Sequence, residues 1–207
     1  MRSALPALGL LIGAFGLIAQ VIVTVPAYMQ LGHSLPAATL YYLSFFTILT
    51  NIAAVLVYAA DLSGQPAFFL RDSVRNGVAM TIAVVGVVYY VVLAALWQPE
   101  GLHYLADFAL HYVAPIFYVI WWLSVGRNGS ARWSNLPGWL AFPFFYLFYA
   151  LFRGATNGEY LYPFLDLSVK SMPSVAVSVG VVVCLFACVG ALVIIVDGLL
   201  AIPSRKP

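Results

Sequence analysis

The sequence predicts an all-α, polytopic membrane protein, a single domain over residues 1–207 built as a bundle of six transmembrane helices. Hydrophobic residues make up 64% of the chain and charged residues only 8%, whereas soluble domains carry about 25% charged residues. Apolar runs recur along the chain, and each is close to the ~20 residues that an α-helix needs to cross the hydrocarbon core. The connections between the runs are short, so no separate soluble module is expected.

The six apolar runs are expected to span the membrane at residues 5–28, 37–60, 77–97, 104–125, 137–152 and 173–202. The first is long for a signal-peptide core and no small-x-small cleavage site follows it, so we expect it to be retained. Gly9 and Gly13 have the GxxxG spacing that lets two helices pack closely. The Val-rich third run is expected to face lipid, and Pro143 is expected to kink the fifth.

Lys and Arg are distributed unevenly between alternate loops. One side carries seven of them, namely Arg2, Arg71, Arg75, Arg127, Arg132, Arg205 and Lys206. The other side carries only Arg153 and Lys170. Because cytoplasmic loops are enriched in Lys and Arg, both termini are predicted to be cytoplasmic, and all three histidines then fall in the outer half of the protein.

The composition also limits the expected partners. The net charge of +2 comes from basic residues that are scattered through the loops, which gives no indication of a nucleic-acid partner. Cys184 and Cys188 lie four residues apart within an apolar run. This pattern indicates neither a disulfide framework nor a tetrahedral metal site, and no metal or organic cofactor is expected.

The second apolar run contains an unusual group of polar residues. In a continuous helix, Ser44, Thr47, Thr50 and Asn51 would share one face, because residues three and four apart are neighbours on a helix. Small hydroxyl and amide side chains in membrane helices mostly form hydrogen bonds to a neighbouring helix or to their own backbone. The strip therefore either packs helices together or carries chemistry.

The fourth run places a histidine at a depth similar to that of Thr47. At 1.5 Å per residue, Thr47 lies roughly 15 Å below the start of its span and His111 roughly 10 Å below the start of its own. Histidine suits the role of general base for a hydroxyl nucleophile near neutral pH, and Asp107, one turn earlier, could orient its ring. We expect the Thr47 hydroxyl and a His111 ring nitrogen to lie within or near hydrogen-bond reach. The structural alternative is an interfacial histidine and an aspartate that stabilises a helix N-terminus.

Three motifs resemble the androgen-induced-protein family, whose members are six-span membrane proteins that include threonine hydrolases of fatty acid esters of hydroxy fatty acids. The matching segments are Phe45-Phe46-Thr47-Ile48-Leu49-Thr50-Asn51, His111 followed by Pro115, and Tyr162-Pro163-Phe164-Leu165-Asp166. The resemblance implies that Thr47 and His111 are the catalytic pair. The close spacing of His111 and Pro115 and the Arg153-Gly154 pair depart from the animal pattern, so the chain looks more like a bacterial branch.

The function predicted from the sequence is hydrolysis of a lipid ester, with a fatty acid ester as the substrate and no cofactor. Asn51, one turn from Thr47, is a candidate donor to the oxyanion, with an interhelical hydrogen bond as its alternative role. Arg153 could bind a fatty-acid carboxylate, unless it pairs with Glu159 or Asp166. Tyr162 is a further candidate for substrate binding, within a segment that is expected to form a structural cap. The alternative to an enzyme is a lipid-binding or scaffold protein of the membrane.

The uneven distribution of basic residues gives a first testable prediction. Reporter fusions or cysteine accessibility should place positions near Arg71 and Arg127 in the cytoplasm and positions near Gly101 and Gly158 outside. A C-terminus found outside would contradict this topology and would also place the polar groups of the second and fourth runs in the cytoplasmic half.

Overall fold

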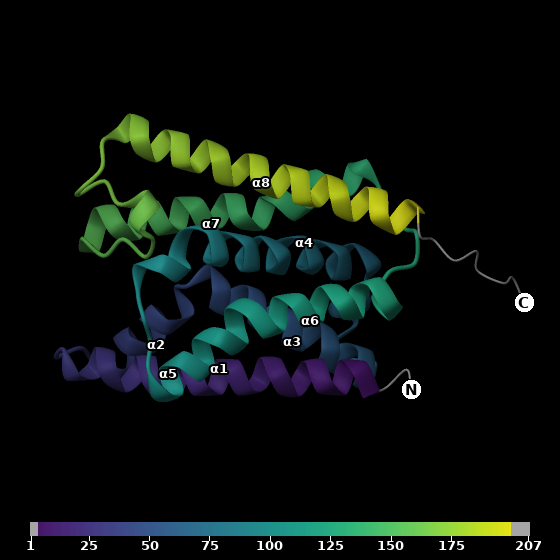
Figure 1. Cartoon of the computed structure of the whole chain (residues 1–207), viewed down its shortest axis with the longest axis horizontal. Helices are drawn as coiled ribbons and strands as arrows, with labels where there is room; N and C mark the ends of the chain where they lie inside the picture. Colours follow the sequence, from purple (N-terminus) through teal and green to yellow (C-terminus); the bar gives the residue numbers. More distant parts are fainter. Residues whose placement is uncertain (1–3, 200–207) are drawn as a thin grey trace, which may run out of the picture.

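The computed structural model describes residues 4–199, and the described chain is all-α (Figure 1). Six helices are long and apolar enough to cross a membrane, which makes the chain an integral multi-pass membrane protein. They cover Ala4–Gln30 (α1), Phe46–Ser63 (α3), Asp72–Leu96, Gly101–Gly126, Trp133–Asn157 and Met172–Leu199 (α8). Arg2, Arg205, Lys206 and the expected end of the last span at residues 200–202 lie outside the described part.

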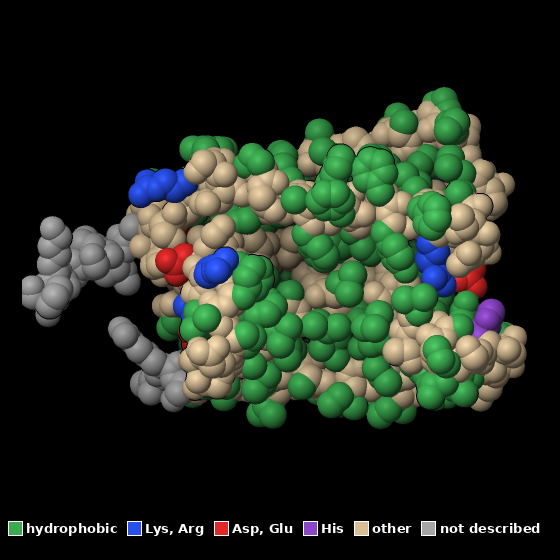
Figure 2. Space-filling model, turned by 180° about the vertical axis from the view of Figure 1, so that it is seen from behind, with side chains coloured by type: hydrophobic (Ala, Val, Ile, Leu, Met, Phe, Trp, Pro, Cys, Tyr) green, Lys and Arg blue, Asp and Glu red, His purple; other side chains and the backbone are tan. Residues whose placement is uncertain are grey.

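The spans alternate in direction, so the start of α1 and the end of α8 lie at one end of the bundle (Figure 1). The connections at residues 31–34, 97–100 and 158–171 lie at the opposite end. Apolar side chains cover the middle of the face in Figure 2, and charged side chains gather near its two ends. This distribution matches a protein whose middle contacts hydrocarbon.

The second span is not the continuous helix that the sequence predicted. The short helix α2 covers Leu35–Leu43, and the chain leaves helical geometry at Phe45 before α3 begins at Phe46. Ser44 therefore caps α2, while Thr47, Thr50 and Asn51 belong to α3. The expected single polar strip is divided between two helices, and Thr47 lies at a helix start instead of in the middle of a span.

The third and fourth spans contain short π-helical turns. The third consists of α4 (Asp72–Val88), a π-turn at Tyr89–Leu93 and a 3₁₀ turn at Ala94–Leu96. The fourth consists of α5 (Gly101–Phe108), a π-turn at Ala109–Val113, α6 (Ala114–Trp121) and a second π-turn at Trp122–Gly126. Such turns insert an extra residue into the helix and occur frequently at functional sites.

The α4 part of the Val-rich third span lies in the centre of the bundle, which corrects the expectation that the span faces lipid, whereas Val91 and Val92 in its last turns are exposed. Helix α4 packs against α3, α6, α7 (Leu136–Asn157) and α8, and it runs between its neighbours in Figure 1. Its buried side chains include Met80 and Ile82, both fully buried, as well as the polar Asn76. Exposed apolar faces lie on α1, α7 and α8 and on the last turns of the third span, and α7 stays α-helical through Pro143.

The glycines of the first span pack α1 closely against its neighbours, as the GxxxG spacing predicted. A Cβ atom added at Gly9 would lie 2.4 Å from Cζ of Tyr58, and one added at Gly13 would lie 2.5 Å from a methyl carbon of Val55. Both partners belong to α3. Glycine at these positions therefore sets the distance between α1 and α3, and α3 carries Thr47.

A buried carboxylate at the end of α8 holds the connection between the fourth and fifth spans. Asp197 is fully buried and accepts hydrogen bonds from the backbone N–H groups of Asn128, Gly129 and Ala131, at 3.0, 3.0 and 2.8 Å. Three N–H donors compensate the cost of burying the charge. The sequence did not indicate this role of Asp197.

The close approach of α1 to α3 gives a prediction about stability. Gly9→Ala should destabilise the protein by about 1–3 kcal/mol, because the added methyl group collides with the buried ring of Tyr58. Gly180→Ala is the matched control, since nothing lies within 4 Å of a Cβ at Gly180. Thermal unfolding of both variants in detergent measures the difference, and equal melting temperatures would contradict the packing role of Gly9.

Candidate functional site

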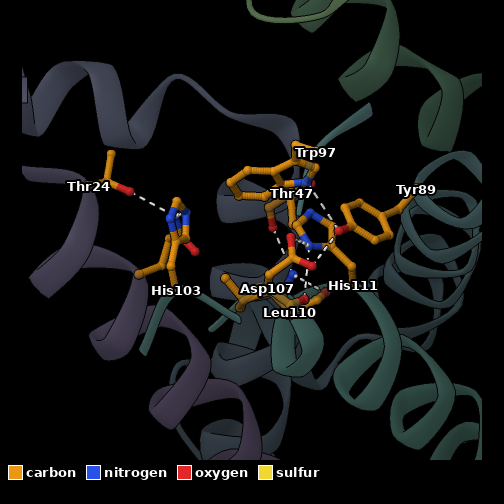
Figure 3. Close-up of polar contacts among 10 residues, drawn as sticks. Thr24, Thr47, Tyr89, Trp97, His103, Asp107, Leu110 and His111 are labelled. Atoms are coloured by element: carbon orange, nitrogen blue, oxygen red, sulfur yellow. Dashed lines mark hydrogen bonds and ion pairs between the residues drawn. The ribbon is translucent and has the colours of Figure 1, made fainter. Parts of the chain in front are cut away.

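A cavity of about 730 Å³ lies at the end of the bundle that is remote from the start of α1 and the end of α8. It is lined by residues from α1, α2, α3, the third and fourth spans and the loop before α8. Four of the six residues singled out in the sequence line this cavity, namely Thr47, Asp107, His111 and Tyr162. Figure 3 shows Thr47, Asp107 and His111 together with Tyr89 and Trp97.

Thr47 is the second residue of α3, so it lies where the backbone N–H groups of a helix have no helical acceptor. The first hydrogen bond of α3 runs from the N–H of Leu49 to the carbonyl of Phe45, at 3.2 Å. The N–H groups of Thr47 and Ile48 therefore precede the helical ladder, and both residues line the cavity. A helix N-terminus carries partial positive charge and favours a negatively charged oxygen.

Three tyrosines hold the break between α2 and α3. The N–H of Phe46 donates to the hydroxyls of Tyr146 and Tyr162, each at 3.1 Å. Tyr146 also donates to the carbonyl of Ser44 at 2.8 Å, and the hydroxyls of Ser44 and Tyr149 lie 2.5 Å apart. The sequence did not single out Tyr146 and Tyr149. Two tyrosines three residues apart share a helix face, and buried tyrosine hydroxyls usually find a polar partner, so this pair in a Phe- and Leu-rich span could have indicated a polar contact.

His111 lies in a π-turn of the fourth span, and the turn before it holds the ring. Its Nδ1 atom lies 3.0 Å from the carbonyl oxygen of Asp107 and 3.1 Å from Oδ1 of the same residue. Both neighbours are acceptors, so Nδ1 carries the proton in the neutral ring and Nε2 keeps its lone pair. The Tyr89 ring stacks on His111, with centroids 3.9 Å apart, and its hydroxyl donates to Asp107 Oδ2. Asp107 thus links Tyr89 to His111.

Thr47 and His111 line the same cavity, but no hydrogen bond joins them within residues 4–199. The Nε2 atom of His111 has no hydrogen-bond partner in that part of the chain. The depth match expected from the sequence therefore brings the two residues to one cavity without direct contact between their polar atoms. Catalytic hydrogen bonds are often long or poorly aligned before substrate binds.

Tyr162 lies beside Thr47 and keeps its proton. It precedes the 3₁₀ turn Pro163–Leu165 in the loop before α8. Burial raises the pKa of the Tyr162 phenol, and the hydrogen-bonding groups that oppose this shift include both the side chain and the backbone of Thr47. The phenol is therefore a neutral hydroxyl next to Thr47, and it can donate to an oxygen atom in the cavity.

Asn51 and Arg153 have structural partners and line neither this cavity nor a second, smaller one nearby. The amide of Asn51 donates to the carbonyls of Thr47 and Leu110, at 2.9 and 3.3 Å, so it joins α3 to the fourth span. Arg153 pairs with Glu159, which also accepts a hydrogen bond from Tyr28 at 2.5 Å. Asn51 therefore forms the interhelical hydrogen bond, and Arg153 forms the ion pair, that the sequence left open as alternatives.

Comparisons of the chain with models of protein families, with curated proteins and with solved structures find no match. Within residues 4–199, no three His, Cys, Asp or Glu side chains are grouped so that they could hold a metal ion.

The tyrosine contacts at the helix break give a prediction. Tyr146→Phe should destabilise the protein by about 1–3 kcal/mol, because it leaves the buried carbonyl of Ser44 without its donor. Tyr90→Phe is the control, since Tyr90 is 71% exposed. Chemical unfolding of the two variants in detergent gives the comparison. A Tyr146→Phe protein as stable as the control would show that the break does not need this hydroxyl.

Proposed function

We propose that this protein is a membrane-embedded hydrolase of lipid esters, with Thr47 as the nucleophile and His111 as the general base. The observation that carries the proposal is the position of Thr47. Its hydroxyl lines a cavity at the N-terminus of a helix, and a histidine with a free Nε2 lines the same cavity. A hydroxyl, a base and N–H donors are the groups that acyl transfer requires.

The reaction proceeds in two steps, acylation of Thr47 and hydrolysis of the acyl-enzyme. The hydroxyl oxygen of Thr47 attacks the ester carbonyl and its proton passes to Nε2 of His111, which gives a tetrahedral oxyanion. The oxyanion collapses, the alcohol leaves with the proton from His111, and the acyl group stays on Thr47. Water then attacks the acyl-enzyme while His111 accepts its proton. The fatty acid leaves and Thr47 recovers its hydrogen.

The oxyanion needs donors, and the first turn of α3 can supply them. The N–H of Ile48 precedes the helical ladder, and the neutral hydroxyl of Tyr162, which hydrogen-bonds with the Thr47 backbone, lies beside it. These donors replace Asn51 in this role, because its amide hydrogens are already directed at two carbonyl groups. Asp107 contributes by fixing the proton of His111 on Nδ1.

The resemblance to the androgen-induced-protein family supports the same assignment of Thr47 and His111. It also supports a fatty acid ester of a hydroxy fatty acid as the class of substrate and a bacterial cell membrane as the location. Among the described residues, Arg71, Arg75, Arg127 and Arg132 lie in or beside the connections at one end of the bundle, and Arg153 and Lys170 lie in or beside the connection before α8 at the other end. This distribution supports cytoplasmic termini and an outward-facing cavity.

A lipid-binding or scaffold protein is the second candidate. The missing hydrogen bond between Thr47 and His111 favours it, because a preformed catalytic pair would place the two polar atoms in contact. In such a protein the cavity holds a lipid that is not cleaved, and Thr47 packs helices together.

Substitutions at Thr47 separate the two candidates. Thr47→Ser keeps the hydroxyl and should retain some hydrolysis of fatty acid esters. Thr47→Val keeps the shape and should lower the rate by at least about 100-fold, and His111→Ala should match it because both remove the same step. The hydrolysis rate of each purified variant in detergent and its labelling by a fluorophosphonate are the measurements. An active Thr47→Val protein would contradict Thr47 as the nucleophile, and an unaltered protein that neither hydrolyses the esters nor takes the label would favour the lipid-binding alternative.

Thr50→Val is the matched control for Thr47→Val. Thr50 lies one turn along α3, it is fully buried, and its hydroxyl has no hydrogen-bond partner in the described chain. Its substitution should leave hydrolysis unchanged. If Thr47 only joins helices, Thr47→Val should cost about 0.6 kcal/mol of stability and leave any activity intact.

A further inference from the structure

A second cavity, of about 250 Å³, lies between α4, α7 and α8. None of its lining side chains is charged, and its polar groups are the hydroxyls of Thr47 and of three tyrosines. The rest of its lining is apolar and includes Val85, Leu147, Val182 and Phe186. Such a cavity suits a hydrocarbon chain and has little to offer a polar headgroup.

The two cavities meet at the proposed nucleophile. Four residues line both of them, namely Thr47, Tyr89, Leu93 and Tyr162. An ester with its carbonyl carbon at the Thr47 hydroxyl therefore extends one arm into each cavity. One arm is the acyl chain and the other is the alcohol part of the ester.

The position of His111 decides which cavity receives the acyl arm of the ester and which receives the alcohol arm. His111 lines the larger cavity and not the smaller one. In the proposed reaction the proton held by His111 goes to the oxygen of the leaving alcohol. The alcohol must therefore lie on the larger side, where Gln20 and His103, with nitrogens 3.4 Å apart, offer polar contacts. The acyl chain is left with the apolar cavity.

The apolar cavity is open towards the outside of the bundle. Phe144 of α7 and Val183 of α8 line it and yet remain 55% and 50% exposed. Those outer faces are the apolar ones that contact membrane hydrocarbon. At about 250 Å³ the cavity is smaller than the ~300–1,000 Å³ of sites that bury a whole drug-sized ligand. The end of a long acyl chain therefore extends into the lipid.

Resting on the proposed hydrolase function, we propose that the cavity between α4, α7 and α8 is the acyl-chain subsite. It receives the long-chain acyl group of a fatty ester directly from the membrane, between α7 and α8, while the alcohol part occupies the larger cavity.

A pair of neighbouring substitutions tests the subsite. Val182→Trp fills the apolar cavity, whereas Val181→Trp places the same side chain at a position that is 64% exposed and does not line it. The measured quantity is kcat/KM of the purified full chain for p-nitrophenyl palmitate, divided by that for p-nitrophenyl butyrate. The ratio should fall about ten-fold or more in Val182→Trp and stay unchanged in Val181→Trp. An unchanged ratio in an active Val182→Trp protein rejects the subsite and leaves the hydrolase proposal in place.

A cross-linking experiment on the unaltered protein covers the case in which Val182→Trp does not fold. The probe is a hexadecyl fluorophosphonate with a diazirine at the end of its alkyl chain. The Thr47 oxygen forms a bond to phosphorus, fluoride leaves, and the hydroxyl proton passes to His111. Irradiation followed by peptide mass spectrometry should then locate cross-links on α7 or α8. Cross-links on α1 or α5 would reverse the assignment of the two arms, and failure to label Thr47 would contradict the hydrolase proposal itself.

Discussion

The geometry of the cavity depends on one constraint, which is that backbone polar groups cannot remain unpaired in a membrane interior. The break between α2 and α3 frees the N–H of Phe46 and the carbonyl of Ser44, and each such group would cost several kcal/mol in hydrocarbon. Tyr146 and Tyr162 provide the missing partners. Because the break is stabilised in this way, α3 can begin in the middle of the protein and direct its first turn at the cavity.

Two further irregularities bring the other polar groups to the same place. Tyr89 and His111 each lie in a π-turn, where the extra residue rotates the following side chains relative to a regular helix. The two rings stack, and Asp107 receives a hydrogen bond from Tyr89 while it lies within 3.1 Å of the His111 ring. A helix start and two π-turns thus converge on one cavity, in a bundle whose other long segments, α1, α7 and α8, are regular helices.

The arrangement of the spans could be deduced only in part. The sequence marks Gly9 and Gly13 as a close-packing face, because two glycines four residues apart on a helix let a neighbouring helix approach closely. It misleads about most of the Val-rich third span, because α4 forms the centre of the bundle and only the last turns of the span are exposed. Lipid tails and protein interiors are equally apolar, so a run of valines does not tell which of the two it contacts.

The sequence by itself determined the fold class, the number of spans and the candidates Thr47, Asp107, His111 and Tyr162 that line the cavity. The fold class and the spans follow from composition and helix length, which the thickness of the hydrocarbon core fixes. Thr47, Asp107 and His111 follow from the rarity of polar groups within apolar runs, whereas Tyr162 was indicated by the loop motif Tyr162-Pro163-Phe164-Leu165-Asp166. The break at Phe45, the π-turns and the pairing of Arg153 with Glu159 were decided only by the tertiary structure. For Arg153 the sequence left Glu159 and Asp166 open as partners, and the structure pairs it with Glu159. The break depends on Tyr146 and Tyr162, which lie about a hundred residues further along the chain, and local propensity contains no information about such partners.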